Sequence, residues 1–421
     1  MLLSCFYLFI AKTIIKSLKL NIMKNLKKIL LPKAIVSKGR RETNRILTFS
    51  LGLSLVLILS SCSGSPGAIQ SSSLNLPEEP QPKGYVCYRT SSPVSPDGVL
   101  DEKAWGEVPW TDYFVDIEGS AKPVPRLKTH AKLLWDDSNL YIAAELEEPN
   151  VWARLRQRDT IIFYDNDFEV FIDPDGDTHA YYELEVNALG TPWDLLLLKP
   201  YRDGGPAVTG WDIAGLKVGT HIDGTINNPN DVDKGWTVEI IIPLSALKDW
   251  RNGTSLPKAG DQWRIDFSRV EWRTIKEKGI YNKEINPKTG KPFPEDNWVW
   301  SPQGRINMHM PEMWGYLQFS SIIAGTGTES FVPDKDLDKK WALRMVYYAE
   351  NMYYIKNNTY SSSLKDIGLN RADFPKNLSA PMINSTRTTF ESYIPAENKN
   401  TMWTIYQDGR IVNLSDSLAK K

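Results

Sequence analysis

Short segments in which apolar and polar residues alternate constrain the fold of this chain more than any other feature of its sequence. A period of two is typical of a β-strand with one face in a core, because successive side chains of a strand point to opposite faces. Turn-forming residues separate these segments, and no long helical period occurs between about residues 84 and 319. Segments of this kind are Leu140–Glu148, Asp167–Asp173, Tyr181–Asn187, Gly235–Leu247 and Trp263–Trp272. The pattern predicts a mainly β fold, an antiparallel β-sandwich of the jelly-roll type, over residues 84–320.

The pattern changes after residue 335, where a small α+β domain over residues 336–421 is expected. Small and turn-forming residues fill positions 321–335 and predict a linker. Beyond it, apolar residues recur every three or four positions, which indicates an amphipathic helix. These residues are Leu337, Trp341, Met345, Tyr348, Met352 and Ile355. The tail Thr401–Leu414 alternates around a turn and predicts a hairpin. The role of this domain stays open, and contact with a protein partner is one possibility.

The N-terminal region predicts an exported protein with a lipid anchor. Basic residues precede the apolar run Ile46–Ser60, which has about the length of a signal-peptide core and is short for a membrane span. The run ends in Leu-Ser-Ser-Cys, which resembles the bacterial lipobox, so we expect cleavage before Cys62 and lipidation of its sulfur. The alternative is an uncleaved anchor with a buried Cys62. The resemblance implies a bacterial cell-envelope protein, lipid-anchored at the outer membrane and facing either the periplasm or the outside.

The predicted organisation before the sandwich has two further parts. Residues 1–62 are expected to be an N-terminal extension and lipoprotein signal peptide, in which either Met1 or Met23 is the true start. Residues 63–83 are rich in Ser, Pro and Gly and predict a flexible tether.

Composition narrows the class of ligand. Lys and Arg number 50 and Asp and Glu 51, so no global positive field favours a nucleic-acid partner, and none is expected. Fifteen Trp is a high count, and aromatic rings beyond the needs of a core often serve as flat apolar surfaces for ligands that are partly polar. An oligo- or polysaccharide is the obvious ligand of that kind.

The segment Tyr164–Asp177 holds six acidic residues in fourteen positions. In a strand its acidic side chains would share one face and its apolar side chains the other. If the segment forms a hairpin with the strand that follows, one register sets Glu169 opposite Glu185 and Asp167 opposite Asn187. These residues would form a polar platform on the outer face of the sheet.

Two functions fit this platform, and a third interpretation gives it no function. A pair at Glu169 and Glu185 would suit a hydrolase of O-glycosyl bonds, because opposed residues lie about 4.5–5.5 Å apart at Cβ and retaining glycosidases need carboxyl groups about 5–5.5 Å apart. Sugar binding is the second, because carboxylates and amides pair with neighbouring hydroxyls while an aromatic ring covers the apolar side of a pyranose. The alternative is the solvated face of a strand.

One loop is a candidate site for calcium as a structural cofactor. Asp173, Asp175 and Asp177 have the spacing that lets carboxylate oxygens converge on a hard cation. The EF-hand template fails beyond them, because its sixth and twelfth positions would be Thr178 and Leu184. A solvated turn that closes a hairpin is the competing interpretation of this loop.

Several separated motifs resemble the family 9 carbohydrate-binding modules known as appendages of xylanases. They include "SPDGVLDEKAWGEVPW", "DNDFEVFIDPDGDTHAYYELEVNALGTPWD", "GWTVEIIIPLSAL" and "NWVWSPQGRINMHMPEMWGYLQFS", in that order, within roughly Val86–Ser320. The resemblance implies a DOMON-like β-sandwich, bound calcium, and binding of glycans without cleavage, in support of polysaccharide catabolism. It favours a non-catalytic protein over a hydrolase, and a structural or interaction protein with a degenerate sugar site is a third possibility.

Carried over by position, the resemblance implies specific sugar contacts. The family Glu falls on Glu169, a clamp Trp falls near Phe163 or Tyr164, and the family Arg falls on Glu185, which reverses the charge. Near the second clamp position the candidates are Trp298, Trp300 and His309. The expected carbohydrate-binding residues are Tyr164, Glu169, Glu185, Asn187, Trp298, Trp300 and His309.

Overall fold

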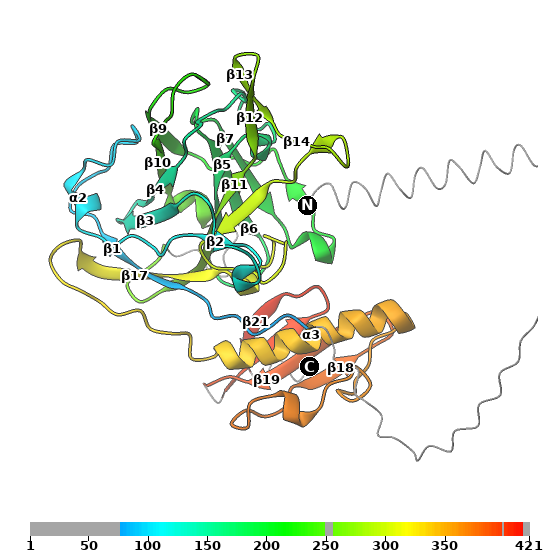
Figure 1. Ribbon diagram of the computed structural model, residues 1–421. Coiled ribbons are helices and arrows are strands. Elements are labelled where there is room, and N and C mark those ends of the chain that lie inside the picture. Colours follow the sequence, from blue (N-terminus) through cyan, green and yellow to red (C-terminus); the bar gives the residue numbers. More distant parts are fainter. Residues whose placement is uncertain (1–75, 249–255, 398–399, 416–421) are drawn as a thin grey trace, which may run out of the picture. The chain divides into compact units, whose positions relative to one another are not determined.

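The chain is mainly β in the computed structural model, which describes residues 76–248, 256–397 and 400–415 (Figure 1). The predicted signal peptide, the lipidation residue Cys62 and most of the tether lie outside these residues. The described residues belong to one compact unit, residues 73–421. Among the described helices, none is both long and apolar enough to cross a membrane.

Thirteen strands of the described chain form one large sheet. They are β1 (Gly84–Arg89), β2 (Val115–Asp116), β3 (Thr129–Trp135), β4 (Asn139–Glu147), β5 (Asp167–Asp173), β6 (Tyr181–Asn187), β7 (Pro192–Leu197), β8 (Ala207–Val208), β9 (Lys217–Asp223), β10 (Gly235–Pro243), β11 (Gln262–Glu271), β16 (Asp296–Val299) and β17 (Gly315–Ile323). The main order is β8-β7-β6-β5-β11-β17-β1-β3-β4-β10-β9, while β16 pairs with β11 and β2. The pairings are antiparallel except that β1 runs parallel to both β17 and β3.

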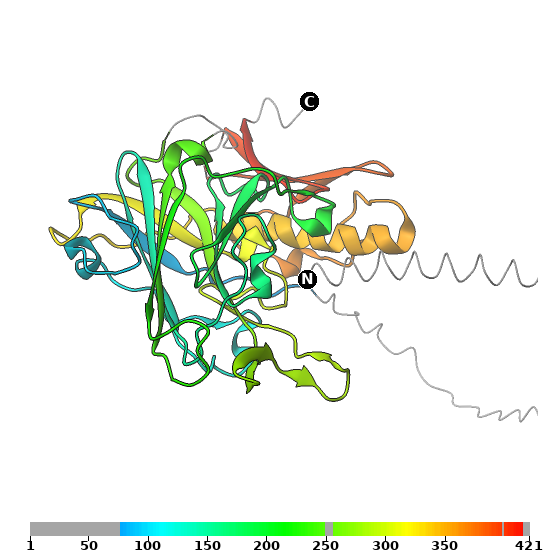
Figure 2. The same ribbon diagram turned by 90° about the horizontal axis from the view of Figure 1, so that it is seen from above.

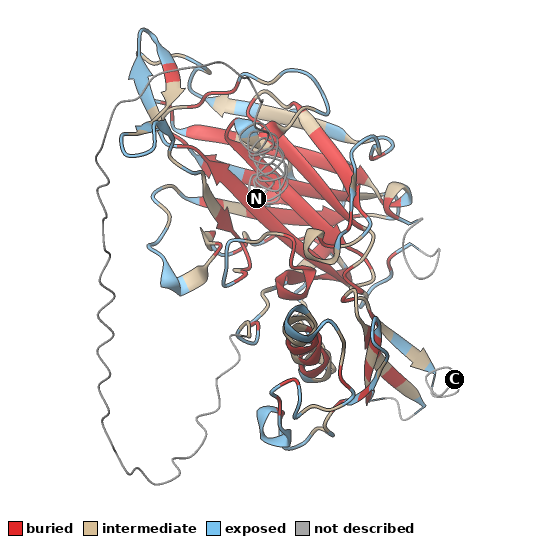
Figure 3. Ribbon diagram, turned by 90° about the vertical axis from the view of Figure 1, so that its right-hand side faces the viewer, coloured by how far each residue is buried: buried red, intermediate tan, exposed pale blue. Residues whose placement is uncertain are grey.

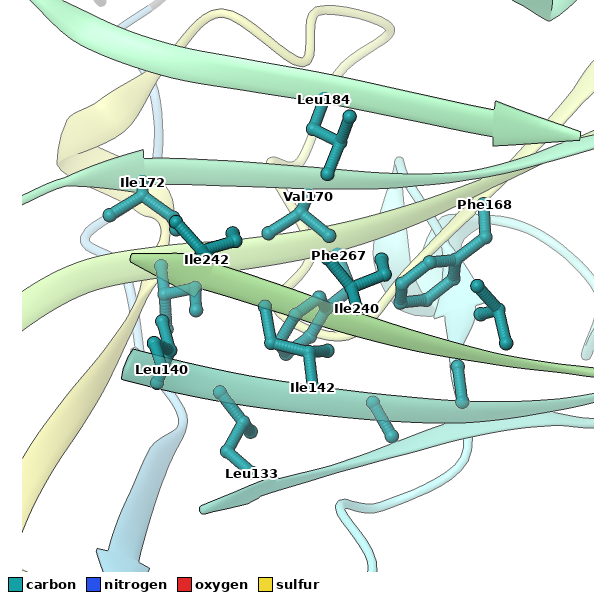
Figure 4. Close-up of a cluster of buried hydrophobic side chains, with 14 of the residues drawn as sticks. Leu133, Leu140, Ile142, Phe168, Val170, Ile172, Leu184, Ile240, Ile242 and Phe267 are labelled. Atoms are coloured by element: carbon teal, nitrogen blue, oxygen red, sulfur yellow. The ribbon is translucent and has the colours of Figure 1, made fainter. Parts of the chain in front are cut away.

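The large sheet folds over on itself to enclose one core. Inward side chains of β5, β6 and β11 meet those of β3, β4 and β10, as Val170, Leu184 and Ile142 illustrate (Figure 4). Burial runs along these strands, whereas several connecting loops and hairpin tips are exposed (Figure 3). The prediction of a mainly β, antiparallel sandwich is therefore confirmed, with the two parallel pairings of β1 as an addition.

Smaller elements extend from this sandwich. The short helix α2 (Lys103–Gly106) places Trp105 so that its indole nitrogen donates to Glu239 Oε1 at 2.8 Å. Six short 3₁₀ segments occur among the described residues, and two small hairpins follow β11. The hairpin strands are β12 (Thr274–Glu277), β13 (Ile280–Lys283), β14 (Ile285–Asn286) and β15 (Lys291–Pro292). The 3₁₀ segments are η1 (Gly119–Ala121), η2 (Ile162–Tyr164), η3 (Tyr201–Asp203), η4 (Leu244–Leu247), η5 (Pro311–Met313) and η6 (Arg371–Asp373).

The C-terminal module packs helix α3 (Leu337–Asn357) against a four-stranded sheet (Figure 2). The strands are β18 (Met382–Ser385), β19 (Phe390–Pro395), β20 (Thr401–Tyr406) and β21 (Ile411–Ser415). The predicted helix and terminal hairpin are both present. The predicted apolar stripe is only partly correct, since Ile355 is 85% exposed while Leu343, Val346 and Tyr347 are buried.

Helix α3 also contacts the sandwich, which explains why a single stripe does not describe its burial. Trp341 packs with Met310 and Met313 of the loop before β17. The guanidinium of Arg202 donates to Glu312 Oε2 at 2.9 Å and to the Tyr347 hydroxyl at 3.2 Å. One side of the helix therefore faces its own sheet and another faces sandwich residues.

Candidate functional site

A groove of about 550 Å³ opens beside the N-terminal end of β5. The segment before β5 forms one side of it, and the hairpin β12–β13 forms the other. Tyr164, one of the predicted contact residues, lines it and is 47% exposed. The other lining residues are Trp152, Arg154, Leu155, Asp165, Ile275, Glu277, Asn282, Lys283 and Ile285. Aromatic, apolar and charged groups thus share one accessible concave surface.

Asp165 holds one wall of this groove in place. Its Oδ2 accepts hydrogen bonds from the backbone nitrogens of Arg154 at 2.7 Å and Leu155 at 2.8 Å. The same oxygen accepts from Asn187 Nδ2 at 3.0 Å, and that amide also donates to the Leu155 carbonyl at 2.8 Å. Asn187 is fully buried, so it supports the groove from behind. The expectation that Asn187 contacts a sugar is therefore wrong, because its amide is enclosed and occupied.

Lys283 brings a positive charge to the opposite wall. Its ammonium lies 3.2 Å from the centroid of the Trp272 ring and 5.7 Å from that of Tyr164. Burial lowers the pKa of Lys283 to about 8, although Asp165 opposes the shift. An ammonium beside an accessible Tyr ring can donate to sugar hydroxyls while the ring covers an apolar sugar face.

The predicted pairing of the acidic strands is confirmed, but the platform is not open. Glu169 lies opposite Glu185 and Asp167 opposite Asn187. The segment before β5 covers them, and the backbone nitrogen of Phe163 donates to Glu185 Oε2 at 3.0 Å. Both Glu169 and Glu185 are buried and neither lines the groove, so they do not present the polar surface that alternation predicted.

Burial sets the electrostatics of this acidic face. It raises the pKa of Glu169 to about 7, and it raises the pKa values of Asp167 and Glu185 well above the usual range. Neighbouring carboxylates add to the increases at Asp167 and Glu185, because like charges disfavour ionisation. The same holds for Glu183, which lies next to Glu185 on the same face of β6.

The two predicted Trp rings near the second clamp position belong to the core. Trp298 and Trp300 are each 3% exposed and pack in the interior cluster of the sandwich. The strand β16 inserts beside β11 and β2, which turns this stretch inward. The expectation that Trp298 and Trp300 offer a sugar-stacking wall is therefore wrong.

His309 is likewise a packing residue. It is buried, its Nδ1 lies 2.9 Å from the Tyr181 hydroxyl, and its ring meets Phe171 edge to face. Burial lowers the pKa of His309 to about 3, so the ring is neutral near pH 7. The expectation that His309 contacts a ligand is wrong for the same reason as for the two Trp residues.

The predicted calcium loop closes a turn and contacts the C-terminal hairpin. Oxygens of Asp173, Asp175 and Asp177 lie within 4.8 Å of one another, so the expected convergence is present. Asp173 already accepts from the backbone nitrogens of Gly176 and Thr178. Asp177 accepts from Arg410 Nε at 2.7 Å. These contacts reduce the number of free lone pairs, and calcium at this loop stays a prediction.

Sequence reasoning missed Asp165 as the support of the groove and Lys283 as its cation. Asp165 stood within the acidic segment, but only the fold shows that three nitrogens converge on its Oδ2. Lys283 lies on a separate hairpin, and no local pattern connects it to Tyr164. Arg158, in the loop before the acidic segment, pairs with Asp194 and Asp212.

Comparison with protein families gives a match within the sandwich. Residues 96–267 match the family model described as "Carbohydrate family 9 binding domain-like". The sandwich thus contains a family 9-like domain. The match runs from the loop before α2 into β11, and so includes the groove residues Trp152 to Asp165 and the acidic strands β5 and β6. The resemblance predicted from the sequence motifs is confirmed.

Comparison with curated proteins gives no match. Three solved structures are similar to this chain, and each of them is matched over its whole length. One is a putative carbohydrate-binding protein from Bacteroides uniformis, 17% identical over 57% of this chain, with a TM-score of 0.42. The second is a carbohydrate-binding module of family 9 from Caldicellulosiruptor kristjanssonii in complex with glucose, 17% identical over 60% of this chain, with a TM-score of 0.36. The third is such a module from the same organism in complex with cellotriose, 16% identical over 59% of this chain, with a TM-score of 0.35.

Proposed function

We propose that the family 9-like domain binds an oligo- or polysaccharide in the groove beside Tyr164. The observation that carries the proposal is the match of residues 96–267 to a carbohydrate-binding family. The groove adds a half-exposed aromatic ring flanked by Arg154, Asp165 and Lys283. Such a set of one apolar surface and a few placed polar groups suits a sugar, which has both apolar faces and hydroxyls.

A glycan array with the full-length protein in detergent micelles tests the proposal, with calcium and with a chelator. Tyr164→Ala should weaken binding of any positive glycan by at least about tenfold, which corresponds to about 1.4 kcal/mol. Tyr113→Ala is the matched control, because Tyr113 is 51% exposed and lines a different groove of about 600 Å³ on β3, β4, β9 and β10. Loss of binding in Tyr113→Ala alone would place the site in that groove. If no glycan on the array binds, the proposal is contradicted.

We further propose that this protein binds glycan without cleaving it and supports polysaccharide catabolism at the cell envelope. Burial of Glu169 and Glu185 supports the first part, since neither carboxylate lines the groove. Incubation of the protein with each bound glycan should release no new reducing ends. Release that disappears in Glu169→Gln would instead establish a hydrolase.

The proposed location is the outer membrane of a bacterium, with lipid on Cys62. The apolar run and the lipobox-like Leu-Ser-Ser-Cys support it. Several acyl chains on one residue would give stable anchoring, whereas one chain is marginal. In cell fractionation, the unaltered protein should appear with outer membranes and Cys62→Ser should lose that association. The C-terminal module is then available for a protein partner, which cross-linking in cells would reveal.

A further inference from the structure

Two cations line the groove beside Tyr164, and no carboxylate of the described residues forms an ion pair with either of them. Lys283 contacts the rings of Trp272 and Tyr164, and Arg154 Nη2 donates to the backbone carbonyl of Tyr281. Burial is the main cause of the lowered pKa of Lys283, but Arg154 contributes, so the two positive charges repel each other. The groove therefore holds positive charge that a ligand of opposite charge would compensate.

The acids near the groove leave this positive charge available. Asp165 Oδ2 already accepts three hydrogen bonds, from two backbone nitrogens and a buried side-chain amide. Glu277 lies next to the tip of the hairpin β12–β13, where 55% of its side chain is exposed and Lys278 is 3.7 Å away. Asp165 and Glu295 oppose the effect of burial on the pKa of Lys283, but neither forms an ion pair with its ammonium. The charge that is free to meet a ligand is therefore mainly positive.

Trp152 supplies a neutral donor to the same groove. It lines the groove and is 4% exposed, and its indole Nε1 is enclosed without a hydrogen-bond partner among the described residues. Buried polar atoms are nearly always satisfied, so this nitrogen indicates a ligand with an acceptor oxygen. The guanidinium carbon of Arg154 lies 5.6 Å from the centroid of the Trp152 ring. A charged donor and a neutral donor thus lie close together.

The three donors share one chemical requirement. Ammonium, guanidinium and indole groups donate hydrogen bonds and accept none. A hydroxyl of a neutral sugar satisfies one donor and brings no charge, whereas a carboxylate brings two oxygens, about four lone-pair sites and a negative charge. Hydrogen bonds between such cations and a carboxylate are about twice as strong as neutral ones, and a guanidinium can bind both oxygens at once. Together with the accessible Tyr164 ring, the donors therefore fit a sugar that carries a carboxylate.

We propose that the groove selects glycans that contain uronic acid, with Lys283 and Arg154 as the cationic contacts of the uronate carboxylate and Trp152 Nε1 as a further donor. This inference rests on the proposed function and adds the class of sugar to it. Tyr164 covers the apolar face of the sugar, and the cations decide between an acidic sugar and a neutral one. A sulfated sugar carries a negative charge on a tetrahedral group and is the competing ligand.

Matched pairs of glycans test the selectivity. Oligogalacturonate, oligomannuronate and oligosaccharides with glucuronic acid are each compared with their carboxyl-reduced counterparts, in which a hydroxymethyl group replaces the carboxylate. A sulfated galacto-oligosaccharide is the further ligand. Isothermal titration calorimetry uses the full-length protein in detergent micelles. At least one acid should bind about tenfold or more tightly than its reduced form, because only the acid forms charge-assisted hydrogen bonds with the two cations.

Three variants assign the selectivity to the groove. Lys283→Gln keeps a hydrogen-bonding side chain but removes the charge, so it should reduce the preference for the acid over its reduced form by about tenfold. Trp152→Phe keeps an aromatic ring but removes the indole nitrogen, and it should weaken binding of the acid. Lys276→Gln is the matched control, because Lys276 is an exposed lysine of the same hairpin that does not line the groove. It should leave both affinities unchanged.

The outcomes separate this inference from the proposed function. If Tyr164→Ala abolishes binding but every acid binds no more tightly than its reduced form, the inference is wrong while the proposed function stands. Binding of the sulfated ligand without binding of any uronate would also refute the inference, and so would a preference that survives in Lys283→Gln. If no glycan binds, the proposed function fails and the inference fails with it.

Discussion

Replacement of Arg202 by Met should lower the free energy of unfolding, because Arg202 connects the sandwich to helix α3. Arg202 is largely buried, with 19% of its side chain exposed, and donates to Glu312 Oε2 at 2.9 Å and to the Tyr347 hydroxyl at 3.2 Å. Met keeps much of the aliphatic volume but leaves Glu312 buried without this partner. Removal of one member of a buried ion pair costs about 3–5 kcal/mol, because the other charge loses its compensation.

The ionisation of Glu312 gives a second measure of the same interaction. Burial raises the pKa of Glu312, but Arg202 and Arg344 outweigh burial and lower the value from 4.5 to about 2. At about 1.4 kcal/mol per unit, this shift corresponds to about 3 kcal/mol in favour of the folded chain. Arg344 supplies part of it, so the loss on Arg202→Met should lie near the lower end of the range.

The pH dependence has a defined sign. Glu312 is a stronger acid in the folded chain than in the unfolded chain, so its contribution is complete above pH 4.5 and disappears as the pH falls toward 2. Urea unfolding followed by Trp fluorescence at pH 7 and pH 3.5 measures both effects. Between pH 7 and pH 3.5 the unaltered protein should lose stability relative to Arg202→Met, because Glu312 is a weaker acid in the variant.

A double variant identifies the cause. Arg202→Met combined with Glu312→Leu removes both charges, and replacement of a buried pair by apolar residues is often neutral. The double variant should therefore recover most of the stability that Arg202→Met loses. A loss of less than about 1 kcal/mol at pH 7 in the single variant would match an exposed pair and refute the reasoning.

Three further predictions concern the sandwich. Trp300→Ala should lower the free energy of unfolding by about 3–5 kcal/mol, because it leaves a cavity in the core, while any glycan affinity of the folded protein stays unchanged; a large drop in affinity measured by calorimetry would show that this ring contacts ligand after all. Gly98→Ala should lower the thermal midpoint, because Gly98 has a φ of +86° and a new Cβ would lie 2.3 Å from the backbone carbon of Thr220; an unchanged midpoint would contradict the strain. Burial raises the pKa of Glu239 to about 7, so the folded chain holds this proton more tightly than the unfolded chain and gains stability as the pH falls from 7 toward 4.5. In urea unfolding, Glu239→Gln should therefore gain less stability between pH 8 and pH 5 than the unaltered protein. An equal gain would refute the assignment.

The strands and their local pairing could be predicted because they depend on residues close in sequence. Alternation fixed which side chains of β5 and β6 face the core, and a short turn limited the register to one that sets Glu169 opposite Glu185. Helix α3 was predicted for a similar reason. Its buried face was not, because Trp341 contacts Met310 and Met313 of a distant loop.

The accessibility of the site could not be predicted, because it depends on segments that cover the sheet from elsewhere in the chain. Alternation separates two faces of a strand but does not show that Phe163 and its neighbours cover the acidic face. Trp298 and Trp300 lie in an irregular stretch, and their burial follows from the pairing of β16 with β11. Lys283 reaches the groove only because the hairpin β12–β13 lies opposite Tyr164.

The position of β1 between β17 and β3 has a consequence for the order in which the chain folds. β1 is the first strand of the sheet to be synthesised, but one of its two neighbours, β17, ends at Ile323 and is made more than two hundred residues later. Until then β1 has an unpaired edge, which is a template for association with other chains. Contacts between distant residues also slow folding, because loop closure must precede them. A partly synthesised chain that ends before β17 should therefore be prone to aggregation, and a chaperone that shields the edge of β1 should improve the yield of the folded protein.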